Sequence, residues 1–146
     1  MTAADVDMDA VAFMQCGGDD VDEFWRRAAV ATAGLTRAWF DAGIDVVVTH
    51  GPFFESDGFD VLQSALPADV KVHKILLRVA AEVAIERVHD DSTRSISRDP
   101  QFVRDSNDRL QRLGDALPVM DLELDTTRRT PDQLATDVIA AVLPDL

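Results

Sequence analysis

Four short segments of this chain carry residue types suited to chemistry on a phosphoryl group. The first two hold aspartates and a histidine, and the last two are rich in arginine, threonine and acid: Asp7, Asp9 and His50, then Arg87, Arg94, Arg98, Asp125, Thr126, Thr127 and Arg128. A carboxylate within hydrogen-bond reach of a hydroxyl can take its proton. A guanidinium is planar, always charged and bidentate toward phosphate.

The sequence has no phosphate-binding loop beside these residues. The run G-x-x-x-x-G-K-[ST] occurs nowhere, and the two lysines, Lys71 and Lys74, lie in an apolar, strand-like stretch without an adjacent glycine. Histidines and cysteine show no metal-ligand spacing, and no serine sits in a G-x-S-x-G turn. We therefore expect neither a protein-held metal nor an esterase.

Helices and strands that alternate along the chain would position these segments. A possible strand remnant surrounds Val6, and strands are predicted at 44–48, 70–79 and 118–125 from their β-branched or alternating residues. Helices are predicted at about 19–42, 59–66, 80–89 and 100–117 and from Thr130-Pro131 onward, with Gly43 closing the first of these. Strands separated by helices predict an α/β protein with a parallel sheet.

These segments resemble the P-loop kinase-like phosphotransferases often labelled AAA-type ATPases, relatives of chloramphenicol phosphotransferase and shikimate kinase. The resemblance covers residues 6–143. It implies a P-loop NTPase-like three-layer sandwich, ATP and Mg²⁺ as cofactors, and phosphoryl transfer to a hydroxyl on a small molecule. His50 stands where the family often has an aspartate that helps hold magnesium, and neutral imidazole is a poor ligand for that cation.

The resemblance also implies a role for each segment. Asp9, with Asp7 beside it, would face the acceptor hydroxyl, and His50 would bind a phosphate or the acceptor. Arg94 and Arg98 would close over the transferring phosphoryl group as part of a lid at residues 90–100, with Arg87 near the substrate. The last segment would lie by the adenine base: Asp125, Thr126, Thr127 and Arg128. A solvated loop, a strand end and a helix cap are the structural alternatives for these residues.

In the family, a first strand and its phosphate loop precede everything seen here, and that strand is central. Three explanations for its absence stay open: a start recorded too far downstream, which we favour, a decayed fragment, or a short protein that reuses the scaffold. The strands that flank the missing one would either pair directly or leave open edges that invite another chain. Nucleotide affinity is expected to be poor and catalysis absent or very slow.

Composition sets the remaining bounds. The 146 residues fit a single domain, and the net charge of -13 disfavours nucleic acid and anionic membranes as partners. A lone cysteine forms no internal disulfide, and no targeting or membrane-spanning segment is evident, so a cytoplasmic location is expected. The rival function is a non-catalytic acidic binding module that dimerises through an exposed sheet edge or the helix bearing Trp25 and Trp39.

Overall fold

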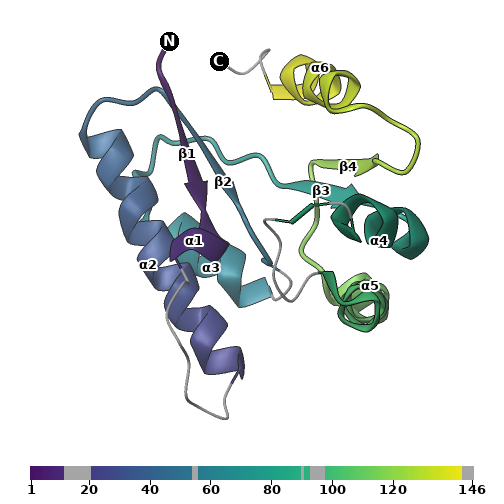
Figure 1. The fold of residues 1–146 in the computed structure, drawn as a ribbon. Helices are drawn as coiled ribbons and strands as arrows, with labels where there is room; N and C mark the ends of the chain where they lie inside the picture. Colours follow the sequence, from purple (N-terminus) through teal and green to yellow (C-terminus); the bar gives the residue numbers. More distant parts are fainter. Residues whose placement is uncertain (12–20, 54–55, 90, 93–97, 143–146) are drawn as a thin grey trace. The chain divides into compact units, whose positions relative to one another are not determined.

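The computed structural model describes residues 1–11, 21–53, 56–89, 91–92 and 98–142 (Figure 1). Within these residues the protein is α/β, with two sheets of two parallel strands each. The chain divides into two compact units, Met1–Val72 with Ala116–Pro118, and His73–Asp115 with Val119–Leu146. The single domain expected from the length stays a prediction.

The first sheet pairs β1 (Ala3–Asp7) with β2 (Val46–His50). Residues around Val6 therefore form a full strand rather than a remnant, and β2 begins two residues later than its sequence predicted. Its start is set by Asp45, whose carboxylate accepts from the Thr2 amide at 2.6 Å while its own amide donates to the Thr2 hydroxyl at 3.2 Å. These bonds hold the ladder in the register that places Asp7 opposite His50.

Helix α2 (Val21–Asp41) covers one face of this sheet (Figure 1). Its inward face is made of small residues, Ala28, Ala29, Thr32, Ala33 and Thr36, all buried. Met8, at the start of α1 (Met8–Val11), packs on Ala28 and Ala29, with Phe24, Trp25, Phe53 and Val61 around them. The helix ends at Asp41, and Gly43 follows it as the predicted closing residue, where a φ of +86° suits a residue without a Cβ.

Helix α3 (Ser56–Ala65) packs against α2 in the same unit. The other face of the β1–β2 sheet exposes Asp5, Val48 and His50 to solvent, with more than half of the Val48 side chain accessible, at 55%. The α/β class is therefore confirmed, and the third layer expected from the resemblance stays a prediction.

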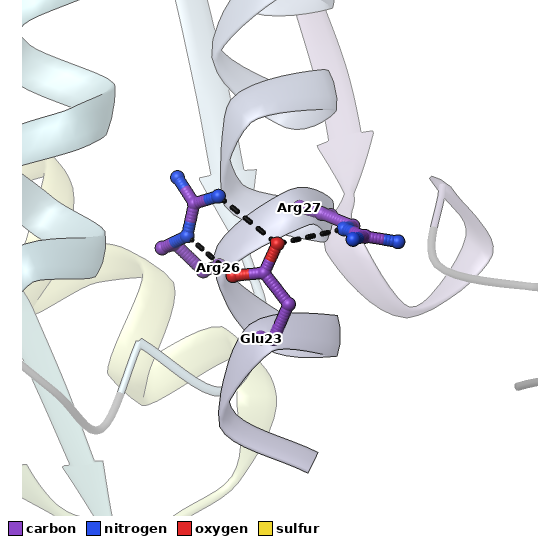
Figure 2. A network of polar contacts seen from close by, with 3 residues as sticks. All are labelled: Glu23, Arg26 and Arg27. Atoms are coloured by element: carbon purple, nitrogen blue, oxygen red, sulfur yellow. Dashed lines mark hydrogen bonds and ion pairs between the residues drawn. The ribbon is translucent and has the colours of Figure 1, made fainter. Parts of the chain in front are cut away.

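The first turns of α2 hold a compact ion-pair network (Figure 2). The two carboxylate oxygens of Glu23 accept from Arg26 Nε at 2.7 Å and Arg26 Nη2 at 3.0 Å, and one of them also accepts from Arg27 Nε at 2.8 Å. These donors hold the pKa of Glu23 at about 2, chiefly through the bond from Arg26 and next through Arg27. Pairs three and four residues apart are neighbours on a helix surface, so the network joins one turn to the next.

The second sheet pairs β3 (Ile75–Arg78) with β4 (Leu122–Asp125). Both strands are shorter than the sequence predicted. The Asp121 carboxylate accepts a hydrogen bond from the Lys74 amide at 2.7 Å, so this amide does not pair with a backbone carbonyl of the opposite strand. Helical segments in the described residues of this part of the chain include α4 (Ala81–His89), α5 (Pro100–Leu113), the 3₁₀ turn η2 (Gly114–Ala116) and α6 (Pro131–Val142). Asp99 caps α5 by accepting from the Gln101 amide, and α6 packs on β4.

The two strands expected to flank a missing central strand, β2 and β3, belong to different units. Among the described residues each has one partner, β1 for β2 and β4 for β3. Both outcomes left open by the sequence, direct pairing of β2 with β3 and open strand edges, stay predictions.

Candidate functional site

The end of the β1–β2 sheet gathers two acids around one histidine. Asp5, Asp7 and His50 share the face opposite α2, because side chains alternate along a strand and His50 stands across from Asp7. His50 Nε2 lies 3.2 Å from an Asp5 oxygen, and its Nδ1 lies 3.8 Å from an Asp7 oxygen. An imidazole between two carboxylates can relay a proton. Of these three residues, Asp5 was not predicted from the sequence.

Asp7 and Asp9 are distinguished by their backbone surroundings. Asp7 is half-buried, and its carboxylate accepts from the Asp9 amide at 2.9 Å, which starts the short helix α1. Asp9 is exposed on that helix. The structure thus brings Asp7 beside His50, whereas the position of Asp9 is set by the turn that Asp7 caps. The assignment of Asp9 as the group that handles the acceptor stays a prediction.

A buried threonine cluster lies beneath β2, on the α2 side of the sheet. Thr36 Oγ1 donates to the Thr32 carbonyl at 2.9 Å and lies 3.2 Å from Thr49 Oγ1. The Thr32 hydroxyl is fully buried and has no hydrogen-bond partner among the residues that the structure describes. These bonds fix the strand position just before His50 and leave His50 itself on the exposed face.

The second unit has an open pocket of about 610 Å³ where β4 ends. Three of the four residues predicted to lie by a base line it, namely Asp125, Thr127 and Arg128, together with Ala80, Glu123, Leu124 and Arg129. The fourth, Thr126, is buried beneath the same turn. An adjoining hollow of about 370 Å³ shares Arg128 and Arg129 and adds Gln133, Thr136 and Asp137 from α6.

The turn at this pocket is held by hydrogen bonds on several sides. Asp125 accepts from the Thr127 amide at 2.8 Å, and the Thr127 hydroxyl accepts from the Ala80 amide at 3.1 Å. Arg87, from α4, donates to the Thr126 carbonyl at 2.7 Å and to the Thr126 hydroxyl at 3.3 Å. The geometry gives Arg87 a positioning role toward the turn, and its predicted contact with substrate stays a prediction.

Charge in the pocket is only partly neutralised. The Thr127 hydroxyl and amide lower the pKa of Asp125, so this carboxylate is an anion at neutral pH. Arg129 pairs with Asp137, and Glu123 pairs with Arg78 at 3.0 Å. Arg128 is exposed and makes no hydrogen bond or ion pair to any residue that the structure describes. The guanidinium of Arg128 is therefore available to a ligand. Arg129 also lines the pocket and was not predicted from the sequence.

The lid prediction falls largely outside the described residues. Arg94 lies there, as does most of the segment 90–100. Arg98 is described, and its Nη2 donates to the His89 carbonyl at 3.2 Å. Where the structure describes the chain, no group of three histidine, cysteine, aspartate or glutamate side chains is placed to hold a metal ion. Over those residues, no helix is long and apolar enough to cross a membrane.

No protein-family model matches the sequence, and no curated protein matches it at a significant level.

Proposed function

We propose that this chain is a P-loop-kinase-like protein that retains a weak site for the base of a purine nucleotide and has little or no phosphotransferase activity. The observation that carries the proposal is the pocket at the end of β4, which collects Asp125, Thr127 and Arg128. The family resemblance of the sequence places the same three residues beside the base.

The residues of the pocket suit a base better than a triphosphate. Ala80 and Leu124 give it an apolar part, and Arg128 offers a planar cation that can stack on a ring. Asp125 can accept from an exocyclic amino group, because its pKa is lowered and it stays ionised. Glu123 and Asp125 would repel a polyphosphate, and the sequence has no loop of amides to neutralise one.

The strand pairing also supports this ancestry. Two parallel pairs, β1–β2 and β3–β4, are what the family pattern implies on the two sides of an absent central strand. The acceptor end would then be the Asp7–His50 corner of the first unit, with Asp5 and Asp9 near it. Mg²⁺ would have to arrive with the nucleotide, since no described cluster fits a protein-held ion.

Saturation-transfer NMR with the full chain tests the binding. Adenosine and ATP are each expected to give a signal at millimolar concentration, and Arg128→Ala is expected to reduce it severalfold. The matched control is Arg104→Ala, which removes an exposed arginine of α5 away from the pocket residues. The absence of a signal with wild type, or equal signals for wild type and Arg128→Ala, would overturn the site.

Thermal unfolding tests the claim of weakness. A ligand present at its dissociation constant adds only about 0.4 kcal/mol of stability, which corresponds to a rise in Tm of roughly 1–2 °C for a chain of this size. Millimolar ATP with Mg²⁺ is therefore expected to raise the Tm very little. A rise of several degrees, or measurable ATP-dependent phosphorylation of a hydroxyl compound, would contradict the proposal.

A further inference from the structure

The charged side chains that line the pocket at the end of β4 either accept hydrogen bonds or donate them. Glu123 and Asp125 carry carboxylates, which only accept when ionised, and Arg128 and Arg129 carry guanidinium groups, which only donate. Among the described lining residues, no asparagine, glutamine or histidine offers a donor and an acceptor together. A ligand that matches this lining presents donors to one group and acceptors to another.

Asp125 is the carboxylate with capacity left for a ligand. Its pKa is lowered chiefly by the Thr127 hydroxyl and next by the Thr127 amide, so it is ionised at neutral pH. One of its oxygens accepts from that amide at 2.8 Å. A carboxylate has about four lone-pair positions, so Asp125 can accept further hydrogen bonds. The other carboxylate of the pocket, Glu123, is engaged by Arg78 at 3.0 Å.

The remaining polar groups of the pocket divide into engaged and open ones. The Thr127 hydroxyl accepts from a backbone amide at 3.1 Å and also bonds to Asp125. Arg129 is held in an ion pair with an acid of α6. Arg128 lies close enough to Asp125 for its charge to lower the pKa of that carboxyl. Of the lining residues that the structure describes, Asp125 and Arg128 are therefore the neighbouring charged pair open to a ligand.

The two purines differ in how donors and acceptors follow one another along their edges. Guanine has two neighbouring donors, N1–H and the N2 amino group, and two neighbouring acceptors, O6 and N7. Two adjacent donors can share one carboxylate, and two adjacent acceptors can share one guanidinium. Adenine alternates an acceptor at N1, a donor at N6 and an acceptor at N7. A carboxylate that meets the adenine amino group therefore also faces a ring-nitrogen lone pair, and an amide side chain suits that base better.

We propose that the base recognised at the end of β4 is guanine rather than adenine. Asp125 accepts from N1–H and from the N2 amino group, Arg128 donates to O6 and N7, and Ala80 and Leu124 supply the apolar lining. This inference rests on the proposed base site and narrows its ligand. Where Arg128 stacks on the ring instead, the contact of Asp125 still favours guanine.

A series of nucleosides tests the preference on the wild-type full chain, by titration followed with saturation-transfer NMR. Guanosine should bind at least about fivefold more tightly than adenosine, because one bidentate pair discriminates between bases by that factor or more. Inosine lacks the N2 amino group, and 1-methylguanosine lacks the N1 hydrogen. Each of these two should lose most of the advantage of guanosine. The comparison changes only the ligand, so the folding of the protein does not affect it.

Asp125→Asn tests the residue assigned to the choice of base. The asparagine oxygen can still accept from the Thr127 amide, so the turn should be retained, and thermal unfolding checks this. The variant should bind guanosine at least about fivefold more weakly and should change adenosine binding by less than about twofold. Asp108→Asn is the matched control, since it removes the same charge from an exposed position on α5 outside the pocket lining. It should leave the preference intact.

The outcomes separate the preference from the site itself. Equal affinities for guanosine and adenosine, both reduced by Arg128→Ala, would overturn the preference for guanine and leave the proposed base site in place. A preference that inosine and 1-methylguanosine retain, or that a folded Asp125→Asn protein retains, would overturn the role of Asp125 and with it this inference. Binding of no nucleoside would remove both the preference and the base site.

Discussion

The guanidinium of Arg87 lies against the backbone of Thr126, with Nη2 at 2.7 Å from the carbonyl oxygen. The same nitrogen lies 3.4 Å from the Thr127 carbonyl, so one side chain of α4 spans two consecutive peptides of the turn after β4. The pocket residues Asp125, Thr127 and Arg128 belong to that turn. Their placement therefore depends on an arginine that contributes nothing to the lining of the pocket.

Replacement of Arg87 by methionine should destabilise the second unit. It removes charge-assisted bonds to a buried threonine turn and leaves the Thr126 carbonyl without that donor, a loss of about 1–2 kcal/mol. Urea unfolding followed by circular dichroism measures the change. Arg104→Met is the matched control and should change the free energy of unfolding by less than about 0.5 kcal/mol. Equal effects from the two variants would remove the positioning role of Arg87.

Acid should remove the stabilisation supplied by Glu23. Its pKa is lowered from 4.5 to about 2 by Arg26 and Arg27, so the ionised side chain favours the folded state above pH 4.5. As the pH falls from 4.5 toward 2, that contribution is lost. The difference in unfolding free energy between wild type and Glu23→Gln should therefore shrink over this range and be constant above it.

Chemical denaturation at a series of pH values from 2 to 7 measures that difference. Glu86→Gln serves as the control, because Glu86 is exposed on α4 and forms no ion pair within the described residues. A pH-independent difference for Glu23→Gln would contradict the network drawn in Figure 2.

Alanine at Gly51 should destabilise the first unit. Gly51 follows β2 with a φ of +150°, and a Cβ added there would lie 2.5 Å from Met8 Cβ. Met8 is buried and its Cβ cannot move away without shifting α1, so a loss of about 1–3 kcal/mol is expected. Gly34→Ala, in open space, should be neutral or stabilising. Thermal unfolding of both variants would reveal the contrast, and a harmless Gly51→Ala would refute the clash.

Valine at Thr32 and at Thr36 should have opposite effects. The buried Thr32 hydroxyl has no partner in the described part of the chain, so replacing it by a methyl group should be neutral or should stabilise the fold by about 1 kcal/mol. The Thr36 hydroxyl bonds to the Thr32 carbonyl and faces Thr49, so its removal should destabilise by about 1 kcal/mol. Equilibrium unfolding in urea compares the two. Destabilisation by Thr32→Val would indicate that this hydroxyl has a partner in solution.

Helix positions followed from the sequence more closely than strand ends did. The periodicity of α2 and its stop at Gly43 are local properties, and the observed helix agrees with them. The starts of β2, β3 and β4 depend on partners far away, because Asp45 and Asp121 bond to residues more than forty positions distant. No local pattern carries that information. For the same reason a full strand at Ala3–Asp7 was underestimated: its strength comes from pairing with β2.

The candidate sites divide in the same manner. Asp125, Thr127 and Arg128 lie within four residues of sequence, so the single turn after β4 brings all three to one pocket. Asp5 and Arg129 were missed because their relevance depends on the approach of His50 and α6, respectively. Asp5 and Asp7 are two residues apart, so they lie on the same face of a strand, and this spacing could have identified Asp5. The position of Arg129 directly after Arg128 could have suggested that it lines the same pocket.

The register of the two ladders has a kinetic consequence. Ala3 pairs with Val46, and Ile75 pairs with Leu122, so each ladder closes a loop of more than forty residues. Such distant pairings slow folding, since the entropy of loop closure is lost before the pairing is gained. During synthesis β1 emerges from the ribosome about forty residues ahead of β2. At ordinary elongation rates of about 5–20 residues per second, β1 therefore stays unpaired for several seconds. A chaperone has time to bind it in this period.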